Sequence, residues 1–152
     1  MSQKVIELLN EARTRELTAI TQYMAQHYEL DAQGFGKVGS KIKEIAITEM
    51  KHAEQLAERI LFLGGAPIYK PSASPKKGEE IPTLIKTDIG LETEAIEMYN
   101  DAASVCGAEK DQVSRHLFEE LLGDEEGHLN YFQTTLAHVE KLGEAYLSTL
   151  AD

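Results

Sequence analysis

Residues 47–65 read ITEMKHAEQLAERILFLGG, and this segment predicts a long amphipathic helix. Its apolar residues recur every three or four positions, which is the spacing of one face of an α-helix. Glu49 and His52 lie three residues apart on that face, between Ile45 and Leu56. A carboxylate and an imidazole therefore occupy positions where the pattern calls for leucine.

The same arrangement occurs a second time, 76 residues further along the chain. Four residues recur at this single offset: Glu16, Tyr23, Glu49 and His52 match Glu92, Tyr99, Glu125 and His128. Four matches in such scarce residue types indicate an internal repeat. Each half places a glutamate and a tyrosine seven residues apart on one helix and a Glu-x-x-His motif on the next.

Four long helices are predicted, with a short fifth helix after them: residues 5–30, 37–63, 82–107, 111–142 and 144–150. Gly64 and Gly65 are expected to end the second helix in the left-handed conformation. Pro82 suits the first turn of the third helix, while Gly107 and Gly143 are expected to end the third and fourth. Strand-like alternation is absent, so the predicted class is all-α. We treat residues 1–152 as a single domain.

The link between the second and third helices, residues 65–81, is expected to be extended because it carries Pro67, Pro71 and Pro75. At about 3.3 Å per residue it can retrace a bundle roughly 40 Å long. The third helix would then run parallel to the second, as in a ferritin-like four-helix bundle with one long crossover. The alternative is a linker between two independent helical hairpins, each of which would bury little apolar surface.

Four glutamates and two histidines are expected to face the interior of this bundle: Glu16, Glu49, His52, Glu92, Glu125 and His128. Desolvated carboxylates are costly, and like charges add to the cost, so the set requires a counter-charge. Two divalent cations cancel four carboxylates, and a mixed carboxylate and imidazole set suits iron or manganese better than calcium. The pattern is that of the carboxylate-bridged di-iron bundles.

Within such a centre, Glu49 and Glu125 are expected to bridge the two metals, and the other two glutamates to bind one metal each. Tyr23 and Tyr99 are expected to donate hydrogen bonds to the ligand carboxylates. The alternatives are that the Glu-x-x-His motifs are solvated surface pairs and that the tyrosines only fill the core. The repetition of both motifs on interior stripes favours the metal centre.

Composition excludes several functions. The chain has 15 Lys and Arg against 26 Asp and Glu, a net charge of −11, which disfavours nucleic acid and anionic lipid as partners. No apolar run approaches the roughly 18 residues of a membrane span, and MSQKVIELLN lacks the organisation of a signal peptide, so we expect a cytoplasmic protein. Cys106 is the only cysteine, which excludes an intrachain disulfide and a cysteine zinc site.

Over nearly its whole length the chain resembles the bacterioferritin family. The matching segments are RELTAITQY (15–23), ITEMKHAEQLAERILFLGG (47–65) and LLGDEEGHLNYF (121–132). The resemblance implies a ferroxidase that oxidises ferrous iron with O2 or H2O2 and stores ferric mineral inside a hollow shell of twenty-four subunits. It also implies a haem shared between two subunits, held by one methionine from each, and an electron donor such as a ferredoxin.

By position, the haem-binding methionine of the family corresponds to Met50. Met50 lies about 100° around the helix from Glu49, so it cannot join the dinuclear centre. Four residues are expected to share its outward face: Ala46, Ile47, Ala53 and Ala57. An apolar stripe opposite a core face implies a partner. A plain subunit contact is the alternative, but the resemblance favours axial ligation of haem by the thioether.

Some members of the family bind a further iron ion through a histidine and an aspartate on the second helix. Those positions are Glu44 and Thr48 here, so that site cannot be carried over to this chain.

Other functions remain open for the same ligands. A di-iron peroxidase of the rubrerythrin kind usually carries a C-x2-C iron module, which a single cysteine excludes. A di-iron hydroxylase would need a substrate pocket or a membrane-binding face, and no apolar run suggests one. A purely structural bundle is disfavoured by the buried carboxylates.

Overall fold

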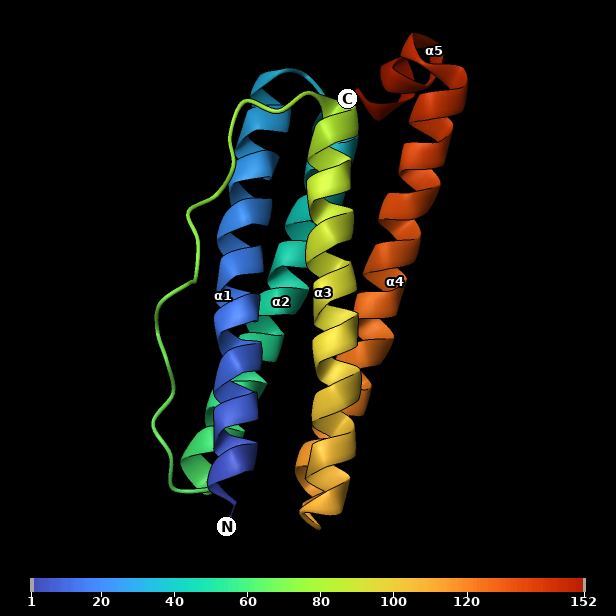
Figure 1. The fold of residues 1–152 in the computed structure, drawn as a ribbon. Helices are drawn as coiled ribbons and strands as arrows, with labels where there is room; N and C mark the ends of the chain where they lie inside the picture. Colours follow the sequence, from blue (N-terminus) through green and yellow to red (C-terminus); the bar gives the residue numbers. More distant parts are fainter. Residues whose placement is uncertain (1, 152) are drawn as a thin grey trace.

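Four long helices lie side by side in the computed structural model, which describes residues 2–151 (Figure 1). They are α1 (Gln3–Ala32), α2 (Gly36–Phe62), α3 (Ile81–Ala108) and α4 (Gln112–Leu142), followed by α5 (Glu144–Leu147) and a 3-10 turn, η1 (Ser148–Leu150). No strand occurs among the described residues, and the predicted all-α class is confirmed. No helix in this part of the chain is long and apolar enough to cross a membrane.

For the four long helices, the predicted boundaries differ from the observed ones by at most two residues, whereas the predicted fifth helix, 144–150, is α5 followed by the 3-10 turn η1. Gly64, with φ of +88°, and Gly143, with φ of +59°, have positive φ values and end α2 and α4 as predicted. The prediction that Gly107 ends α3 is wrong, because Gly107 is helical and Lys110 takes the left-handed conformation at φ +62°. A Cβ at Gly107 would lie 3.4 Å from Cδ of Arg115, an ordinary van der Waals contact, so packing does not require glycine there.

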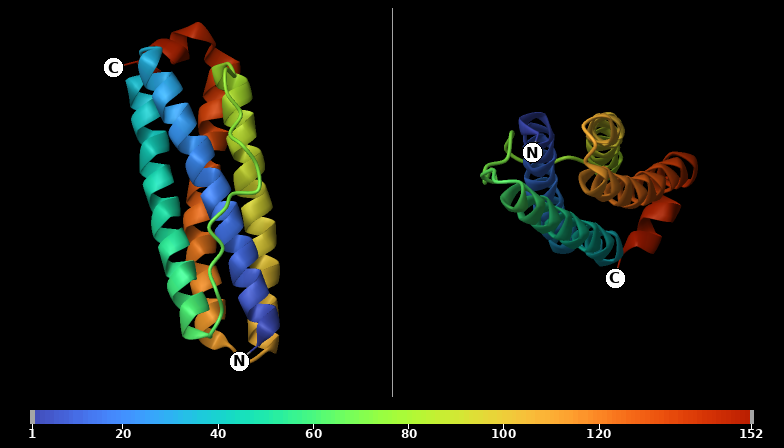
Figure 2. Two further views of the ribbon diagram at one scale, coloured as in Figure 1. Left: turned by 90° about the vertical axis from the view of Figure 1, so that its left-hand side faces the viewer. Right: turned by 90° about the horizontal axis from the view of Figure 1, so that it is seen from below.

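The helices pair as the tight links require: α1 with α2 and α3 with α4, each pair antiparallel (Figure 2). Residues 63–80 form an extended segment that runs beside α1 from one end of the bundle to the other (Figures 1 and 2). The third helix therefore starts at the same end as the second and runs parallel to it. The predicted long crossover is confirmed, and the two helical pairs are not independent hairpins.

Polar side chains of α1 bind the backbone of the crossover along its length. Asn10 accepts from the N–H of Ile68 and donates to the carbonyl of Ala66. Gln22, three turns further along α1, bonds both the N–H and the carbonyl of Lys76. These contacts satisfy backbone groups that an extended segment cannot pair with itself.

The core consists of two apolar clusters, one at each end of the bundle, with a polar layer between them. Leu9, Leu56 and Phe118 belong to the cluster near the N-terminus, and Ile42 and Phe132 to the other. Each such side chain contributes about 1.5–3 kcal/mol when fully buried, which offsets the cost of the polar layer. Four residues that helical spacing places on the interior faces of α3 and α4 are only partly buried: Ile89, Ile96, Leu122 and His128.

Gly65 does not adopt the left-handed conformation predicted for it. The absence of a side chain at this position instead lets Ile6 of α1 lie close to the backbone. A Cβ at this position would lie 2.7 Å from Cγ2 of Ile6 and 3.1 Å from Cγ2 of Ile60. Gly65→Ala should therefore destabilise the fold by about 1–3 kcal/mol, the usual cost of overpacking, and lower the thermal unfolding midpoint by several degrees.

Gly90→Ala is the matched control for this substitution, because no atom lies within 4 Å of a Cβ built on Gly90 in α3. Alanine there should be neutral or stabilising by up to about 1 kcal/mol, through its higher helix propensity. Equal unfolding midpoints for the two variants would contradict the packing described for Gly65.

Candidate metal centre

The polar layer midway along the bundle brings together all six predicted ligands from four helices. They are Glu16 on α1, Glu49 and His52 on α2, Glu92 on α3, and Glu125 and His128 on α4. The four glutamates have no exposed surface, His52 is buried and His128 is partly buried. Each side chain points inward because it occupies a core position of its helix, as the three- and seven-residue spacings require.

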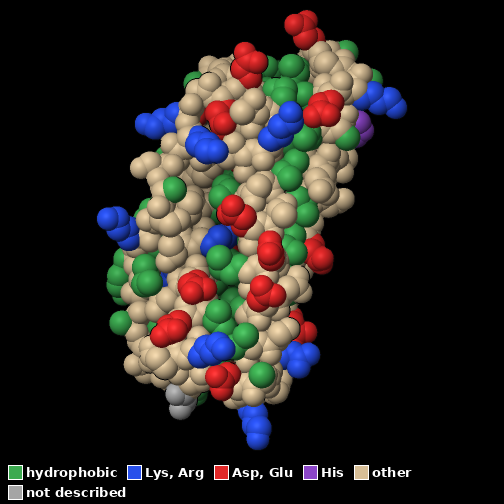
Figure 3. All heavy atoms as spheres, viewed as in Figure 1, with side chains coloured by type: hydrophobic (Ala, Val, Ile, Leu, Met, Phe, Trp, Pro, Cys, Tyr) green, Lys and Arg blue, Asp and Glu red, His purple; other side chains and the backbone are tan. Residues whose placement is uncertain are grey.

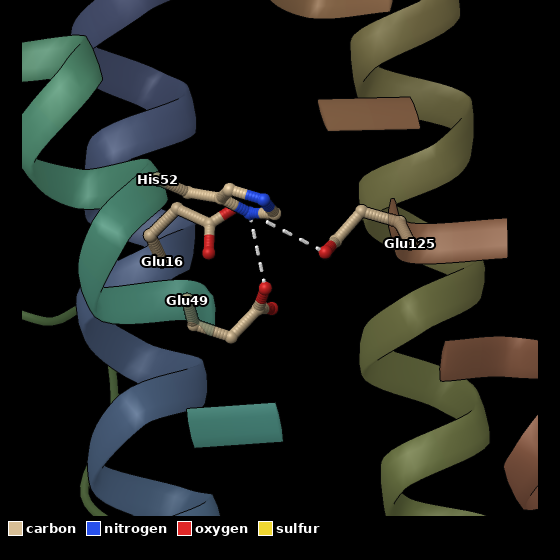
Figure 4. Close-up of side chains that lie close together, drawn as sticks. All are labelled: Glu16, Glu49, His52 and Glu125. Carbon is tan, nitrogen blue, oxygen red and sulfur yellow. Dashed lines mark ion pairs between the residues drawn. The ribbon is translucent and has the colours of Figure 1, made fainter. Parts of the chain in front are cut away.

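The ligand atoms form two overlapping groups, each of a size that fits one metal ion. One group is Glu16, Glu49, His52 and Glu125, the other is Glu49, Glu92, Glu125 and His128, and the atoms of each lie within 4.8 Å of one another. Glu49 and Glu125 belong to both groups, which is where carboxylates that bridge two metals must lie. In the first group the imidazole and carboxylates converge on one point (Figure 4), with His52 Nδ1 3.1 Å from Glu49 Oε1.

Each of the six residues also presents one buried atom that has no hydrogen-bond partner. These atoms are Glu16 Oε2, Glu49 Oε1, His52 Nδ1, Glu92 Oε2, Glu125 Oε1 and His128 Nδ1. An unsatisfied buried polar atom costs about 1–3 kcal/mol, and folded proteins contain few of them. Their concentration on one set of carboxylates and imidazoles fits a pair of iron or manganese ions.

Tyr23 and Tyr99 each reach across the bundle to a glutamate of the other helical pair. The hydroxyl of Tyr23 on α1 donates to Glu92 Oε1 at 2.6 Å, and that of Tyr99 on α3 donates to Glu16 Oε1 at 2.5 Å. Burial, reinforced by the facing carboxylates, raises the pKa of both phenols well above its usual value, so both remain donors. Each half of the repeat thus orients a glutamate of the other half.

Arg15, which the sequence did not single out, places its guanidinium among the four glutamates. Its Nη1 donates to Glu49 and Glu125. The same Nη1 lies 3.4 Å from Glu16 Oε1, and Nη2 lies 3.3 Å from Glu92 Oε1. Burial opposes the charge of Arg15, but the surrounding carboxylates outweigh it and raise the pKa of the guanidinium.

The sequence contains only a weak signal for this role. Arg15 precedes Glu16 by one residue and therefore leaves α1 about 100° away from it, on the flank of the interior stripe. Only the length of the arginine side chain brings its charged end inward. The need of four buried carboxylates for a counter-charge was the available clue.

Asp124 is a second residue that sequence reasoning did not identify. The Nε2 of His52 lies 2.8 Å from Asp124 Oδ2, a distance at which the imidazole donates to the carboxylate. A carboxylate partner on one ring nitrogen fixes the tautomer and leaves the other nitrogen, here Nδ1, available to a metal. Its position next to Glu125 in the sequence DEEGH was the only signal.

Burial and mutual repulsion distribute protons unevenly over the metal-free centre. Burial raises the pKa of Glu16 to about 7, with Glu49 adding to the effect and Arg15 opposing it. Burial alone would lower the pKa of His52, but the carboxylates of Glu16 and Glu49 raise it to about 10. Burial also raises the pKa of Glu125, whereas at Glu49 it is outweighed by Arg15, which lowers the pKa well below the usual range.

Met50 lies on the outer side of α2, away from the metal centre, and is 40% exposed. Ile47 lies one turn away on the same surface and is similarly exposed. The expectation that Ala46 and Ala53 share this outward face is wrong, because both are buried. The backbone carbonyl of Ala53 accepts a hydrogen bond from Arg13 of α1. The apolar surface around Met50 is therefore narrower than the periodicity suggested.

Comparison with known proteins places this geometry in a family. A family described as the ferritin-like domain matches residues 6–142. The chain is 42% identical over 148 residues to the bacterioferritin of Desulfovibrio desulfuricans, covering 97% of this chain and 83% of the relative. It is 39% identical over 150 residues to the bacterioferritin of Streptomyces coelicolor, covering 98% and 90% of the two chains.

Solved structures give the same result. The X-ray structure of Desulfovibrio desulfuricans bacterioferritin, whose diiron site was observed in different catalytic states, is similar with a TM-score of 0.95 and 42% identity, over 97% of this chain and 86% of that one. Rhodobacter capsulatus bacterioferritin, with a metal-free dinuclear site and haem iron on a crystallographic special position, matches with a TM-score of 0.95 and 35% identity, over 100% and 96% of the two chains.

The metal-free protein is expected to lose stability as the pH rises. The raised pKa values of Glu16, about 7, and His52, about 10, mean that folding favours the protonated form of both groups. Their contributions are complete below the unfolded-state pKa values and disappear as the pH passes the folded ones, so the unfolding midpoint should fall between about pH 4.5 and about pH 10.

The measurement is a series of thermal unfolding curves over this range, with and without a divalent metal. Bound metal supplies the counter-charge that ionised carboxylates require, so it should reduce or abolish the fall. Unfolding midpoints that do not differ between metal-free and metal-loaded protein at any pH would contradict the assignment.

Proposed function

The chain belongs to the bacterioferritin family, and from this premise we propose that it is a ferroxidase that oxidises ferrous iron and stores the product. The observation that carries the proposal is the pair of overlapping ligand groups that share Glu49 and Glu125. The diiron site of the Desulfovibrio desulfuricans relative supports it, because that protein matches this chain along nearly its whole length.

Two ferrous ions bound at this centre would each give one electron to dioxygen or hydrogen peroxide. Glu49 and Glu125 would hold the ions as a pair, since each carboxylate belongs to both ligand groups, and a pair could deliver two electrons in one step. Carboxylate oxygens are hard ligands that favour the more highly charged ferric product. The ligand set thus favours oxidation over release of the ferrous ion.

The remaining residues of the centre orient the ligands. The hydrogen bonds from Tyr23 and Tyr99 fix one oxygen each of Glu92 and Glu16 and leave the other oxygen free. Phe132 and Phe118 pack against these two tyrosines, with ring centroids 5.7 Å apart in both pairs. The apolar clusters on either side also keep water out, which strengthens the electrostatic interactions within the layer.

We further propose that the subunits form a hollow shell of twenty-four copies, in which ferric mineral accumulates. Family membership supports this assembly. A rubrerythrin-like peroxidase, or another di-iron oxidase without storage, is the alternative use of the same ligands. The cytoplasmic location stays a prediction.

A haem between two subunits is the second cofactor that we propose, with Met50 of each subunit as axial ligand. The exposed thioether of Met50 beside Ile47 suits such a role, because α2 already has a separate core face. The haem iron of the Rhodobacter capsulatus relative lies on a crystallographic special position, as an atom shared by symmetry-related subunits does. Such a haem would carry single electrons between the iron store and an electron-donor protein such as a ferredoxin.

Glu16→Ala and Glu125→Ala should each lower the rate of ferrous oxidation by roughly a hundredfold, because each removes a ligand from the centre. The two apolar clusters do not involve these side chains, so the helical bundle should remain folded. The rate is followed by the absorbance of the ferric product after ferrous iron is added.

Glu126→Ala is the matched control, since Glu126 is the exposed neighbour of Glu125 on the same helix. Wild-type oxidation by either ligand variant would exclude the proposed centre. Native mass and iron content of the same preparations separate storage from catalysis: a shell with many irons per subunit supports the store, and a dimer with two supports a peroxidase.

Met50→Leu tests the haem assignment, because leucine keeps the size and apolarity of methionine but removes the sulfur. Bound haem and its visible absorption should be lost, while ferrous oxidation persists. Met98→Leu, a substitution of a methionine packed against the core, should retain the haem. Haem with an unchanged spectrum in Met50→Leu would rule out axial ligation by this residue.

A further inference from the structure

Arg15 competes for the same carboxylate oxygens that two bridged metals require. Its Nη1 donates to Oε2 of both Glu49 and Glu125, the two glutamates shared by the ligand groups. A carboxylate that bridges two metals uses one oxygen for each, so these Oε2 atoms are not available to a bridging metal while Arg15 holds them. The arginine and a complete pair of metals therefore exclude one another.

Charge leads to the same conclusion. Four carboxylates balance two divalent cations, whereas a guanidinium left among them would be a buried, uncompensated positive charge next to both metals. Without metals, the same guanidinium is the nearest cation to all four carboxylates and offsets part of their repulsion. Arg15 is thus favourable in the empty centre and unfavourable in the filled one.

A second place for the arginine side chain lies directly outside the centre. A groove of about 590 Å³ opens on the outer surface between α1, α3 and the crossover, and Arg15 forms part of its wall. The Nη2 of Arg15 already donates to the carbonyl of Leu91, which also lines this groove, and its Nε is buried without a partner. The side chain thus lies at the boundary between the centre and the groove.

The groove also contains the carboxylates that would receive the arginine. Glu11 and Glu94 are exposed and line it together with Arg15. Glu11 precedes Arg15 by one helical turn on α1, the spacing and order in which a glutamate and a basic residue pair favourably. Acidic side chains are spread over the middle of this face of the molecule (Figure 3).

We propose that Arg15 is an internal counter-cation that exchanges with the metal. It neutralises the carboxylates while the centre is empty, and it swings into the groove, toward Glu11 and Glu94, when the ions bind. This inference rests on the proposed ferroxidase centre. It adds that Arg15 and the metal ions compete for the carboxylates of that centre. Such a centre binds metal less tightly than its ligands alone would allow, which suits ions that pass through to a store rather than a permanent cofactor.

The test is a titration of the metal-free protein with Co²⁺, followed by its visible absorption, together with thermal unfolding of the metal-free form. Arg15→Met should bind Co²⁺ about tenfold more tightly than the wild type, because no cation has to be displaced. Its metal-free form should unfold several degrees lower, because the carboxylates have lost their counter-charge. Arg115→Met removes the same charge from the surface, where Arg115 pairs with Glu119, and should change neither quantity.

The double variant Glu11→Gln/Glu94→Gln tests the outward position of the Arg15 side chain while Arg15 itself is intact. Both substituted side chains are exposed, so the variant should fold normally. It should weaken Co²⁺ binding several-fold in the wild-type background and leave the metal-free unfolding midpoint unchanged. In the Arg15→Met background the same double substitution should have no effect on Co²⁺ binding. An equal loss in both backgrounds would mean that the groove merely attracts cations, and would overturn the outward position.

Unchanged or weaker Co²⁺ binding by Arg15→Met would overturn the exchange and leave the metal centre standing. If neither the wild type nor Arg15→Met binds Co²⁺, the proposed metal centre itself is wrong, and the exchange with it.

Discussion

Four glutamate side chains buried side by side are the constraint on which the rest of this structure depends. Like charges in a medium of low polarity repel strongly and lose their hydration, so such a cluster persists only with compensation. The fold supplies it in three forms: hydrogen bonds from two tyrosines, the guanidinium of Arg15, and a His52 whose pKa is raised by the same carboxylates. Two apolar clusters supply the free energy that keeps the polar layer buried.

The internal repeat makes this cluster symmetric. It also means that the cluster forms only when both halves of the chain are packed together. Tyr23 belongs to the first half of the chain but donates to Glu92 of the second, and Tyr99 does the reverse for Glu16. Neither helical pair can therefore orient its own ligands. The crossover, held against α1 by Asn10 and other polar side chains, sets the parallel direction of α3 that brings the two halves into register.

The centre is preorganised but not inert. Its six unpartnered atoms point to a common interior, while Arg15 occupies part of the space that a bridged pair of metals would need. With the exchange proposed for Arg15, such a site stays folded while it is empty and can fill and empty repeatedly. That behaviour suits an iron store, in which the ion at the centre is both the reactant and the cargo.

Sequence alone determined the helices, the crossover and the identity of six residues on interior stripes, because helical periodicity is local and a repeat at one offset is visible without coordinates. Glu49 and His52 stand out because they interrupt a stripe of leucine-like positions. Residues on the flanks of those stripes could be assigned only from the packing of the helices. Residues about 100° from a core position, such as Ala53 and Arg15, are buried or exposed according to the neighbouring helix and to side-chain length. Helical periodicity specifies neither the neighbouring helix nor the reach of a side chain. The role of Arg15 as the counter-cation could therefore be identified only from the packed arrangement of the four helices.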